Sequence, residues 1–293
     1  MTESVTRIDV ERVDQAGLSM TSDLVAVEEP LEIRISREGA LPLTVAVTMR
    51  TPGDDGDLAI GYLFTEGIVR RREDVTGVHP CGGGAIRVEL APGVGADLSR
   101  LERRSFTSSS CGACGKTSTE ALRATPAWPL PARDPMIGAA LVHSLPALLR
   151  EAQVLFAATG GLHASALYDL DARLLVLRED VGRHNALDKV IGAELVAGIL
   201  PAHERILIVS GRMSFELVQK ALMAGIPVVA AIGAPSSLAV ELAREAGMTL
   251  LGFVRSERFN CYSGGYRLSL CHPEKRSDEG CAFLPNEHQP TAS

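Results

Sequence analysis

Residues 206–254 decide the fold class, because short apolar runs alternate there with segments of helical periodicity. The stretch reads ILIV at 206–209, FELVQKALMA at 215–224, VVAAI at 228–232, LAVELAREA at 238–246 and TLLGFV at 249–254. Strands that are apolar along their whole length are typical of parallel strands covered by helices on both faces. The sequence therefore predicts alternating strands and helices of an α/β fold.

The same alternation extends upstream of this unit. The predicted elements are a helix over 184–197, strands over 174–177 and 164–168, and a helix over 137–153. Pro146 is expected to bend the last of these helices. The stretch before them, 128–135, is rich in proline and is interpreted as a domain boundary.

The first half of the chain predicts a smaller α+β domain. Extended segments are expected at 31–35, 43–49 and 86–90, and a helix capped by Asp54 or Asp55 is expected to run to residue 64. Residues 105–116, which read SFTSSSCGACGK, are small or polar and offer no face for packing. They are predicted to form a loop.

Four parts are therefore expected along the chain. They are a flexible lead-in over 1–24, an N-terminal domain carrying the C-x-x-C loop over 25–128, a C-terminal α/β domain over 129–267 and a disordered tail over 268–293. The tail mixes charged, polar and proline residues without periodicity, which is typical of disorder. It contains Cys271 and Cys281, for which we predict neither a structural nor a catalytic role.

The composition indicates a globular enzyme. Of the 293 residues, 46% are hydrophobic and 22% are charged, which excludes disorder of the whole chain. A net charge of −7 and an aromatic content of 4% argue against a nucleic-acid-binding or anionic-membrane-binding protein. A local basic pocket for a phosphate-bearing ligand remains compatible with this balance.

The location is expected to be cytoplasmic and reducing. The first thirty residues are acidic and do not read as an export signal. The uncharged run 221–240 contains Pro227 and Pro235, which argue against a membrane-spanning helix. In a reducing compartment the six cysteines are expected to be free, catalytic or metal-bound rather than joined in disulfides.

Cys111 and Cys114 form a C-x-x-C pair on the predicted loop. Gly112 and Gly115 leave the thiols accessible, and Lys116 could favour a thiolate. A zinc knuckle would need a second such motif, and a thioredoxin-like pair would follow a strand and open a helix. Two incidental thiols are the remaining alternative. Carriage of sulfur as a persulfide is the interpretation we favour.

A second group of candidate residues follows the predicted strands of the C-terminal half. TGGLH at 159–163, EDVGRHN at 179–185 and SGR at 210–212 place glycines and cationic side chains between strands and helices. Arg183, His184 and Lys189 lie at or just inside a helix start, where free N–H groups favour an anion. Together they predict a crevice for a phosphate-bearing ligand at the carboxyl edge of the sheet. For each residue alone, a turn with an Arg183–Asp180 ion pair is an equal alternative.

The last candidate segment is RFNCYSGG, at 258–265. Asparagine and backbone groups can read the edge of a base, and an aromatic ring can stack on it. The alternative is a terminal turn with Phe259 in the core. These residues alone do not decide between the two.

Five motifs together resemble the formate dehydrogenase accessory sulfurtransferase (FdhD) family, and they occur in that family's order. They are SSCGACGK at 109–116, TGGLH at 159–163, EDVGRHNALDK at 179–189, SGRMS at 210–214 and FNCYSG at 259–264. The resemblance extends from about residue 25 to residue 267. The acidic lead-in and the tail with Cys271 and Cys281 have no counterpart in it.

The resemblance implies a function. Members of the family transfer sulfur from a cysteine desulfurase to the molybdenum bis(molybdopterin guanine dinucleotide) cofactor before that cofactor enters formate dehydrogenase. It further implies a homodimer and a cytidine-deaminase-like three-layer core in the C-terminal domain. A persulfide is expected on Cys111, with Cys114 as the second catalytic candidate. The residues that the resemblance and the motifs assign to cofactor binding are His163, Arg183, Lys189, Phe259, Asn260, Cys261, Tyr262, Ser263 and Gly264.

Two other functions are compatible with the sequence. One is a chaperone that shelters the molybdenum cofactor without chemistry at Cys111, although a pure carrier would not need the C-x-x-C pair. The other is a thiol oxidoreductase, in which Cys111 and Cys114 would cycle through a disulfide at a defined potential.

Overall fold

A computed structural model describes residues 4–94 and 128–269. Its larger sheet has the strand order β13-β12-β11-β10-β8-β9. The strands are β8 (His163–Tyr168), β9 (Leu174–Asp180), β10 (Ile206–Val209), β11 (Val228–Ala231), β12 (Thr249–Gly252) and β13 (Asn260–Ser263). Strands β10, β11 and β12 are parallel, whereas β8, β9 and β13 pair antiparallel with their neighbours. The parallel unit predicted from residues 206–254 is confirmed.

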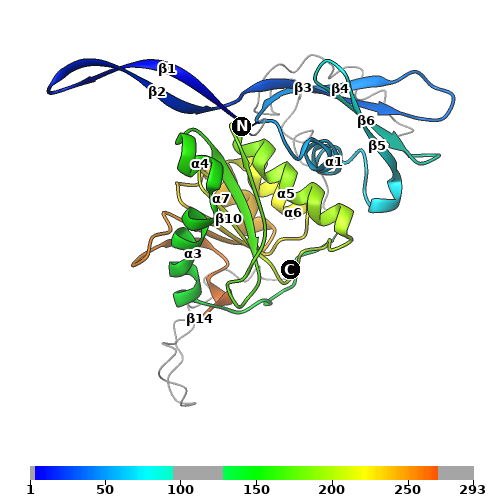
Figure 1. Ribbon diagram of the computed structural model, residues 1–293. Coiled ribbons are helices and arrows are strands. Elements are labelled where there is room, and N and C mark those ends of the chain that lie inside the picture. Colours follow the sequence, from blue (N-terminus) through cyan, green and yellow to red (C-terminus); the bar gives the residue numbers. More distant parts are fainter. Residues whose placement is uncertain (1–3, 95–127, 270–293) are drawn as a thin grey trace, which may run out of the picture.

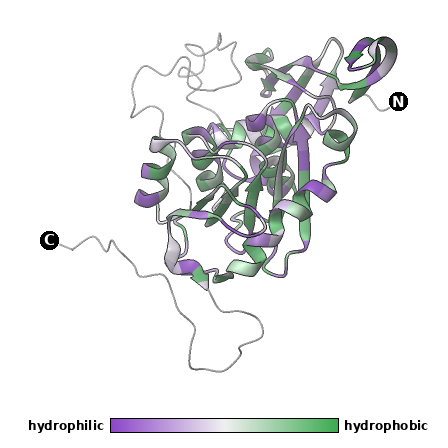
Figure 2. Cartoon of the chain, turned by 90° about the vertical axis from the view of Figure 1, so that its left-hand side faces the viewer, coloured by the Kyte–Doolittle hydropathy of each residue, from purple (hydrophilic) through white to green (hydrophobic). Residues whose placement is uncertain are grey.

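Helices cover both faces of this sheet (Figure 1). They are α3 (Ala139–Ala152), α4 (Val154–Thr159), α5 (Arg183–Ala197), α6 (Phe215–Met223) and α7 (Ser237–Glu245). Alternate residues of β10 show the layering: Leu207 and Val209 join the apolar cluster of α5, α6 and α7, while Ile206 and Ile208 join that of α3. Figure 2 shows the apolar residues concentrated on the inner strands. A three-layer α/β arrangement results, and its cytidine-deaminase-like layout stays a prediction.

The smaller sheet of the N-terminal half has the strand order β4-β3-β6-β5. Its elements are β3 (Glu29–Ser36), β4 (Leu43–Arg50), β5 (Val75–Cys81) and β6 (Ala85–Leu90), with helix α1 (Asp55–Thr65) and the short 3-10 turn η1 (Arg72–Asp74). In β3, the buried residues Leu31, Ile33 and Ile35 alternate with charged Glu32 and Arg34. This period of two sets which face packs on α1. Strand β5, which contains a glycine and a proline, is absent from the sequence prediction.

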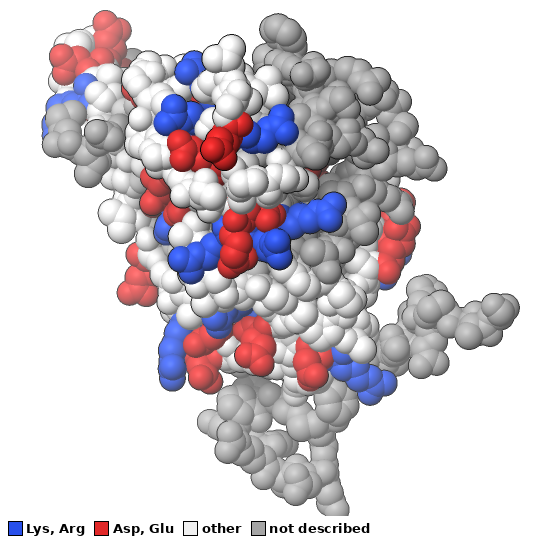
Figure 3. Space-filling model, turned by 90° about the vertical axis from the view of Figure 1, so that its right-hand side faces the viewer, with Lys and Arg blue, Asp and Glu red and all other residues white. Residues whose placement is uncertain are grey.

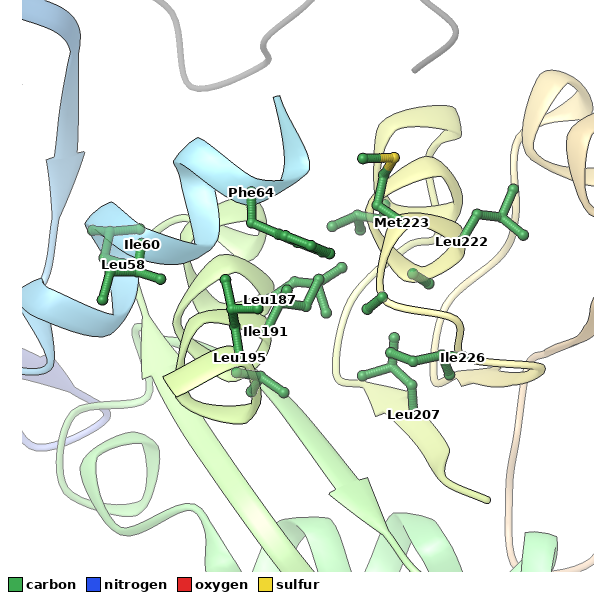
Figure 4. Close-up of a cluster of buried hydrophobic side chains, with 14 of the residues drawn as sticks. Leu58, Ile60, Phe64, Leu187, Ile191, Leu195, Leu207, Leu222, Met223 and Ile226 are labelled. Atoms are coloured by element: carbon green, nitrogen blue, oxygen red, sulfur yellow. The ribbon is translucent and has the colours of Figure 1, made fainter. Parts of the chain in front are cut away.

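One hydrophobic core joins the two halves. Figure 4 shows Leu58, Ile60 and Phe64 of α1 beside Leu187, Ile191 and Leu195 of α5, with Leu207, Leu222, Met223 and Ile226 on the far side. Helix α5 is consequently buried between the larger sheet and α1. The proline-rich stretch at 128–135 therefore does not separate two independent cores, and Trp128 within it stacks on Phe64 with ring centroids 6.1 Å apart.

Two glycines allow α1 and α5 to cross with their backbones in contact. A Cβ atom on Gly61 would lie 1.9 Å from the carbonyl oxygen of Asp188, and one on Gly192 would lie 1.9 Å from that of Asp57. Both distances are far below any permitted contact. The crossing therefore requires glycine on each helix.

The flexible lead-in predicted over residues 1–24 is corrected. Strands β1 (Val5–Asp14) and β2 (Gly17–Ala26) pair in register as an antiparallel ribbon that extends from the body of the molecule (Figure 1). The segment is acidic, but it also contains the β-branched residues Val5, Ile8, Val10 and Val13, which favour strands. Pairing between the two strands satisfies the backbone N–H and C=O groups on their facing edges.

The predicted start of the tail at residue 268 is also corrected. Strand β14 (Leu268–Ser269) follows the 3-10 turn η3 (Gly265–Arg267) and pairs parallel with β7 (Ile137–Gly138). Leu268 is fully buried in the cluster of α3. The folded part therefore extends through Ser269, and the rest of the predicted tail lies outside the described residues.

Three local predictions also change. The helix predicted from residue 137 begins at 139, after β7, and continues through Pro146. Helix α4 was not predicted. Asp54 precedes α1 with a left-handed backbone and makes no side-chain cap; its carboxylate lies 3.4 Å from Arg178 instead.

Over residues 4–94 and 128–269, no helix has the length and apolar character needed to cross a membrane.

Candidate functional site

The turns that follow the sheet strands meet at one edge of the larger sheet. Strand β8 runs antiparallel to β10, so His163 at its start lies at the edge where β10, β11 and β12 end. A pocket of about 520 Å3 opens at this edge. It is lined by Pro146, Leu149, Arg150, Gln153, Phe156, Gly160, Gly161, Leu162, His163, Ser210, Ile232, Val254 and Arg255. The predicted crevice at the carboxyl edge of the sheet thus has a structural counterpart.

His163 is held against the backbone of the turn after β10. A Cβ atom on Gly211 would lie 3.2 Å from Nδ1 of His163, so glycine there lets the imidazole approach. Ser210 fixes the same turn, because its Oγ accepts a hydrogen bond from the N–H of Ala164 at 2.9 Å. Burial, and then the nearby Arg183 cation, lower the pKa of His163, while Asp180 opposes them. Burial and the Arg183 cation therefore both favour the neutral form of the His163 imidazole.

Helix α4 forms one wall of the pocket, and Glu179 fixes its position. The two carboxylate oxygens of Glu179 accept the N–H groups of Leu155 and Phe156, both at 2.8 Å. These are backbone donors that the first turn of a helix otherwise leaves unpaired. The Phe156 ring carries the guanidinium of Arg150 at 4.3 Å from its centroid. Glu179, which belongs to the predicted 179–189 motif, is thus a structural residue of the site.

The pocket lining carries positive charge without a balancing carboxylate. Arg150 and Arg255 both line it, and no Asp or Glu does so among the described residues. Nη1 of Arg255 donates to the carbonyl oxygens of Ile232 and Val254 at 2.8 and 2.7 Å, which holds the side chain at the rim. The described residues contain no cluster of three His, Cys, Asp or Glu able to hold a metal ion. Such a lining suits an anionic organic ligand.

Arg183 and Lys189 take different places, although both belong to the predicted cofactor-binding set. Arg183 begins α5, close enough to His163 to affect its pKa, and its Nε has no hydrogen-bond partner among the described residues. Lys189 is 1% exposed, and its Nζ lies 2.8 Å from Oδ2 of Asp180 and 2.9 Å from the carbonyl oxygen of Thr51. The assignment of Lys189 to direct ligand contact does not fit this placement.

Asp180 organises the turn between β9 and α5. Its Oδ1 accepts hydrogen bonds from the N–H of Gly182 at 2.8 Å and from Nδ2 of Asn185 at 3.1 Å. Asn185 also donates to the carbonyl oxygen of Met49 on β4 at 2.7 Å. The expected alternative of an Arg183–Asp180 ion pair is thus replaced by an Asp180–Lys189 pair. This network attaches the candidate site to the N-terminal sheet.

Residues 259–264 lie beside the pocket rather than in its lining. Phe259 packs against the cluster of α3 and contacts His143, with ring centroids 5.1 Å apart. Asn260, Cys261, Tyr262 and Ser263 form the edge strand β13, in which Asn260 pairs with Gly252 at the end of β12. Gly264 has a φ of 67° and accepts a hydrogen bond from Thr249. Phe259 is thus partly buried against this cluster, whereas the side chains of Asn260 and Cys261 are exposed.

The sequence prediction missed the α3–α4 wall of the pocket. Pro146, Leu149, Arg150 and Gln153 recur with the spacing of one helix face, and all four line the pocket. That periodicity was readable from the sequence, but nothing in it shows that this face points at the TGGLH turn. Cys111 and Cys114 lie outside the described residues, so their place relative to the pocket stays a prediction.

A family model described as FdhD/NarQ matches residues 26–269 of this chain. The chain belongs to the FdhD/NarQ family. The matched range ends at Ser269, the last residue of β14. The prediction made from the five motifs is therefore confirmed.

Curated FdhD proteins are similar to this chain over almost its whole length. The protein named Sulfur carrier protein FdhD of Nocardia farcinica is 49% identical over 268 residues, which cover 88% of this chain and 93% of that protein. Its namesake in Mycolicibacterium paratuberculosis is 50% identical over 256 residues, covering 84% and 92%. A crystal structure of a formate dehydrogenase accessory protein from Desulfotalea psychrophila superposes with a TM-score of 0.71 at 25% identity, covering 90% and 99%.

Proposed function

We propose that this member of the FdhD/NarQ family is a sulfur carrier that supports the maturation of formate dehydrogenase. The observation that carries the proposal is the identity of about half of all residues with proteins named Sulfur carrier protein FdhD, over nearly the full length of both chains. The formate dehydrogenase accessory protein of similar fold gives the recipient. The C-x-x-C pair supplies the thiols that sulfur transfer needs.

In the proposed first step, Cys111 acts as a nucleophile. Its thiolate attacks the outer sulfur of a persulfide on a cysteine desulfurase; an S–S bond forms on Cys111, and the donor cysteine leaves as a thiolate. In the second step the new S–S bond breaks, and Cys111 returns to a thiolate. Sulfur is carried at the oxidation level of the element, so the molybdenum centre that accepts it supplies two electrons. Cys114 would assist release or protect the thiolate.

The proposed acceptor is the molybdenum bis(molybdopterin guanine dinucleotide) cofactor, bound as a substrate. The pocket at the sheet edge supports this assignment, because it combines apolar walls with two guanidinium groups. The arginines, with Arg183 nearby, suit the diphosphate, while Leu149, Ile232 and Val254 suit a flat ring. Residues 259–264 remain candidates for contacts beyond the pocket; among them, Asn260 of β13 pairs with Gly252 at the end of β12. A homodimer in the cytoplasm completes the proposal.

Mass spectrometry of the protein after incubation with a cysteine desulfurase and cysteine tests the sulfur step. We expect a sulfur adduct on Cys111 that Cys111→Ala abolishes, together with loss of formate dehydrogenase maturation. Cys114→Ala should be less damaging. Cys81→Ala is the matched control, because Cys81 is a partly exposed free thiol on β5. If Cys114→Ala alone stops maturation, the two roles are reversed. Normal maturation by both variants would instead indicate a cofactor chaperone.

Binding of guanosine diphosphate tests the pocket. One charge-assisted contact to a phosphate is worth about 1.5–3 kcal/mol, so Arg183→Ala and Arg255→Ala should each weaken binding about tenfold or more. Calorimetry would measure both variants against Arg173→Ala, which removes an arginine with a 76% exposed side chain on the β8–β9 turn. Absence of binding at millimolar nucleotide would exclude the pocket as the guanine site.

A further inference from the structure

The outer half of the β1–β2 ribbon is exposed to solvent at every position from 11 to 20. Val13 lies opposite Leu18, and Glu11 lies opposite Met20. Residues that are opposite each other across a ladder, or two apart along a strand, share a face, so these four side chains lie on one side of the ribbon. Val13, Leu18 and Met20 are 74%, 64% and 66% exposed. The ribbon therefore ends in an apolar surface that faces solvent.

The other side of the outer half is polar. Arg12 pairs with Ser19 there, and Asp14 pairs with Gly17. A sheet that is apolar on one side and polar on the other is patterned to bury its apolar side. Two strands alone are also only marginally stable in water. We therefore expect the apolar side of the tip to pack against another surface.

Helix α4, at the base of the ribbon, is a second apolar surface in contact with solvent. It reads VLFAAT, and none of its residues is buried. Val154 is 72% exposed, and Ala157 and Ala158 are exposed as well.

The tip of the ribbon lies far from α4 of its own chain. Strand β2 contacts α4, and Figure 1 shows the ribbon leading away from this helix. The two strands pair over all 10 of their residues without a register shift, which makes the ribbon about 33 Å long. Each chain thus has two apolar surfaces, at opposite ends of the ribbon, that need a cover from outside the chain.

The charges of the two surfaces are complementary. Over residues 5–26 the ribbon carries four carboxylates and two guanidinium groups, which give it a net charge of −2. Beside α4, the exposed Arg150 places its guanidinium 4.3 Å from the ring centroid of Phe156. The pocket that α4 borders is lined by Arg150 and Arg255 and by no carboxylate of a described residue. An acidic ribbon is therefore attracted to this side of the molecule.

We propose that the β1–β2 ribbon is a dimerisation arm, whose apolar tip packs on α4 of a second copy of this chain. In a two-fold dimer the same contact forms twice, so two arms lying side by side in opposite directions cover all four exposed surfaces. The inference rests on the homodimer of the proposed function and assigns its contact surface. Because α4 carries Phe156 of the pocket lining, the arm of each copy borders the pocket of the other.

Sedimentation velocity of the full chain over a range of concentrations tests this contact. Leu18→Asp places a charge on the tip, and Val154→Lys places one on α4. Each should weaken dimerisation at least about a hundredfold, because the symmetry repeats every lost contact. Leu41→Asp, on the turn between β3 and β4, and Leu238→Lys, on α7, are the matched controls. These leucines are 91% and 56% exposed, and their replacement should leave the dimer unchanged.

Mixing the two variants makes the test specific to a contact between copies. A mixed dimer contains one unaltered tip on an unaltered α4, and one contact in which the introduced carboxylate meets the introduced ammonium. The equimolar mixture should therefore dimerise at least about tenfold more tightly than either variant alone. Circular dichroism of each variant shows that the fold is kept, as expected for replacements at exposed positions.

The outcomes separate the arm from the homodimer. If the wild-type protein is a dimer and both variants keep its dissociation constant, the arm is not the contact while the homodimer stands. Weakening by both variants without recovery in the mixture would also overturn the contact between tip and α4. A wild-type protein that stays monomeric at every concentration would overturn the homodimer and the arm together. The sulfur adduct on Cys111 is measured independently, so none of these results decides the sulfur step.

Discussion

Two buried lysines, each paired with an aspartate, hold together segments that are far apart in the sequence. Lys189 and Asp180 connect α5 to the loop at Thr51, 138 positions away from Lys189. Lys220 of α6 pairs with Asp188 of α5, at 2.8 Å, and also donates to Thr65 of α1. Lys189, the last residue of the 179–189 motif, therefore stabilises the fold, because its ammonium group neutralises the buried carboxylate of Asp180.

Replacement of Lys189 tests this structural role. Lys189→Met leaves the Asp180 carboxylate without its cation in a fully buried site, which should lower the free energy of unfolding by about 3–5 kcal/mol. Arg173→Met is the control, because it breaks an ion pair whose side chains are 76% and 75% exposed and should change stability by less than about 1 kcal/mol. Urea denaturation measures both. A Lys189→Met protein of wild-type stability that no longer binds guanosine diphosphate would restore the ligand role.

His163 should make the stability depend on pH. Burial and Arg183 lower its pKa in the folded protein, so the unfolded chain binds a proton more readily than the folded one. Its contribution to stability is therefore complete above the ordinary pKa of about 6.5 and is lost as the pH falls below that value. Urea midpoints at several pH values should fall less steeply for His163→Gln than for the wild type. His79→Gln, on β5, controls for the removal of one ring, and an unchanged slope in His163→Gln would contradict the prediction.

At the scale of elements, the crossing of α1 and α5 decides how the two sheets are held together. Gly61 and Gly192 bring the helix backbones into contact, and the large side chains of both helices pack on either side of that contact. Close crossing buries α5 on nearly all sides, which explains why it carries Asn185, Asp188 and Lys189 in paired form. In contrast to these buried pairs, Figure 3 shows an outer face of the molecule on which acidic and basic side chains are exposed and intermixed.

Replacement of one of these glycines should separate the helices. Alanine improves helix propensity by about 1 kcal/mol, but overpacking that forces the backbone apart costs more. We therefore expect Gly192→Ala to lower the free energy of unfolding by at least about 2 kcal/mol. Gly56→Ala, in the first turn of α1, is the control because its Cβ would meet only Val78 at 3.7 Å, an ordinary contact. Thermal unfolding compares the two; equal stability of both variants would mean that the crossing tolerates a methyl group.

For the whole molecule, the folded part extends at least through β14, whose residues pack into the α/β unit. Leu268 fills the cluster of α3, and its strand pairs with β7 at the entrance of that helix. Arg267 is also buried and donates to the carbonyl oxygens of Asp134 and Gly247, at 2.9 and 2.7 Å. Strand β14 thus packs against helix α3, which lines the pocket.

Two truncations test this boundary. A chain ending at Ser269 should unfold at the same temperature as the full chain and should mature formate dehydrogenase. A chain ending at Arg267 loses a buried leucine, and by analogy with core leucine replacements it should be about 3 kcal/mol less stable. Calorimetric unfolding distinguishes them. Equal stability of the two truncations would place the boundary earlier, whereas loss of activity in a stable 1–269 chain would give the tail a function.

The sequence by itself determined the α/β class, the three parallel strands and the family. A short apolar run such as 206–209, followed by the turn residues Ser210 and Gly211, indicates a strand buried on both faces, and the structure has that strand as β10. These signals depend on residues that are adjacent in the sequence, so they can be recognised without knowledge of how distant segments pack. The β1–β2 ribbon was the main failure of such reasoning, because its charges resemble those of a disordered segment.

Only the tertiary structure decided which residues line the pocket and which hold it in place. Arg150 and Lys189 are both cationic residues on helices, yet the first lines the pocket and the second is paired with a buried aspartate. That difference depends on the rotation of each helix against the sheet and on partners more than a hundred positions away, such as Thr51. Periodicity fixes which residues share a face of a helix, whereas packing between distant elements fixes where that face points.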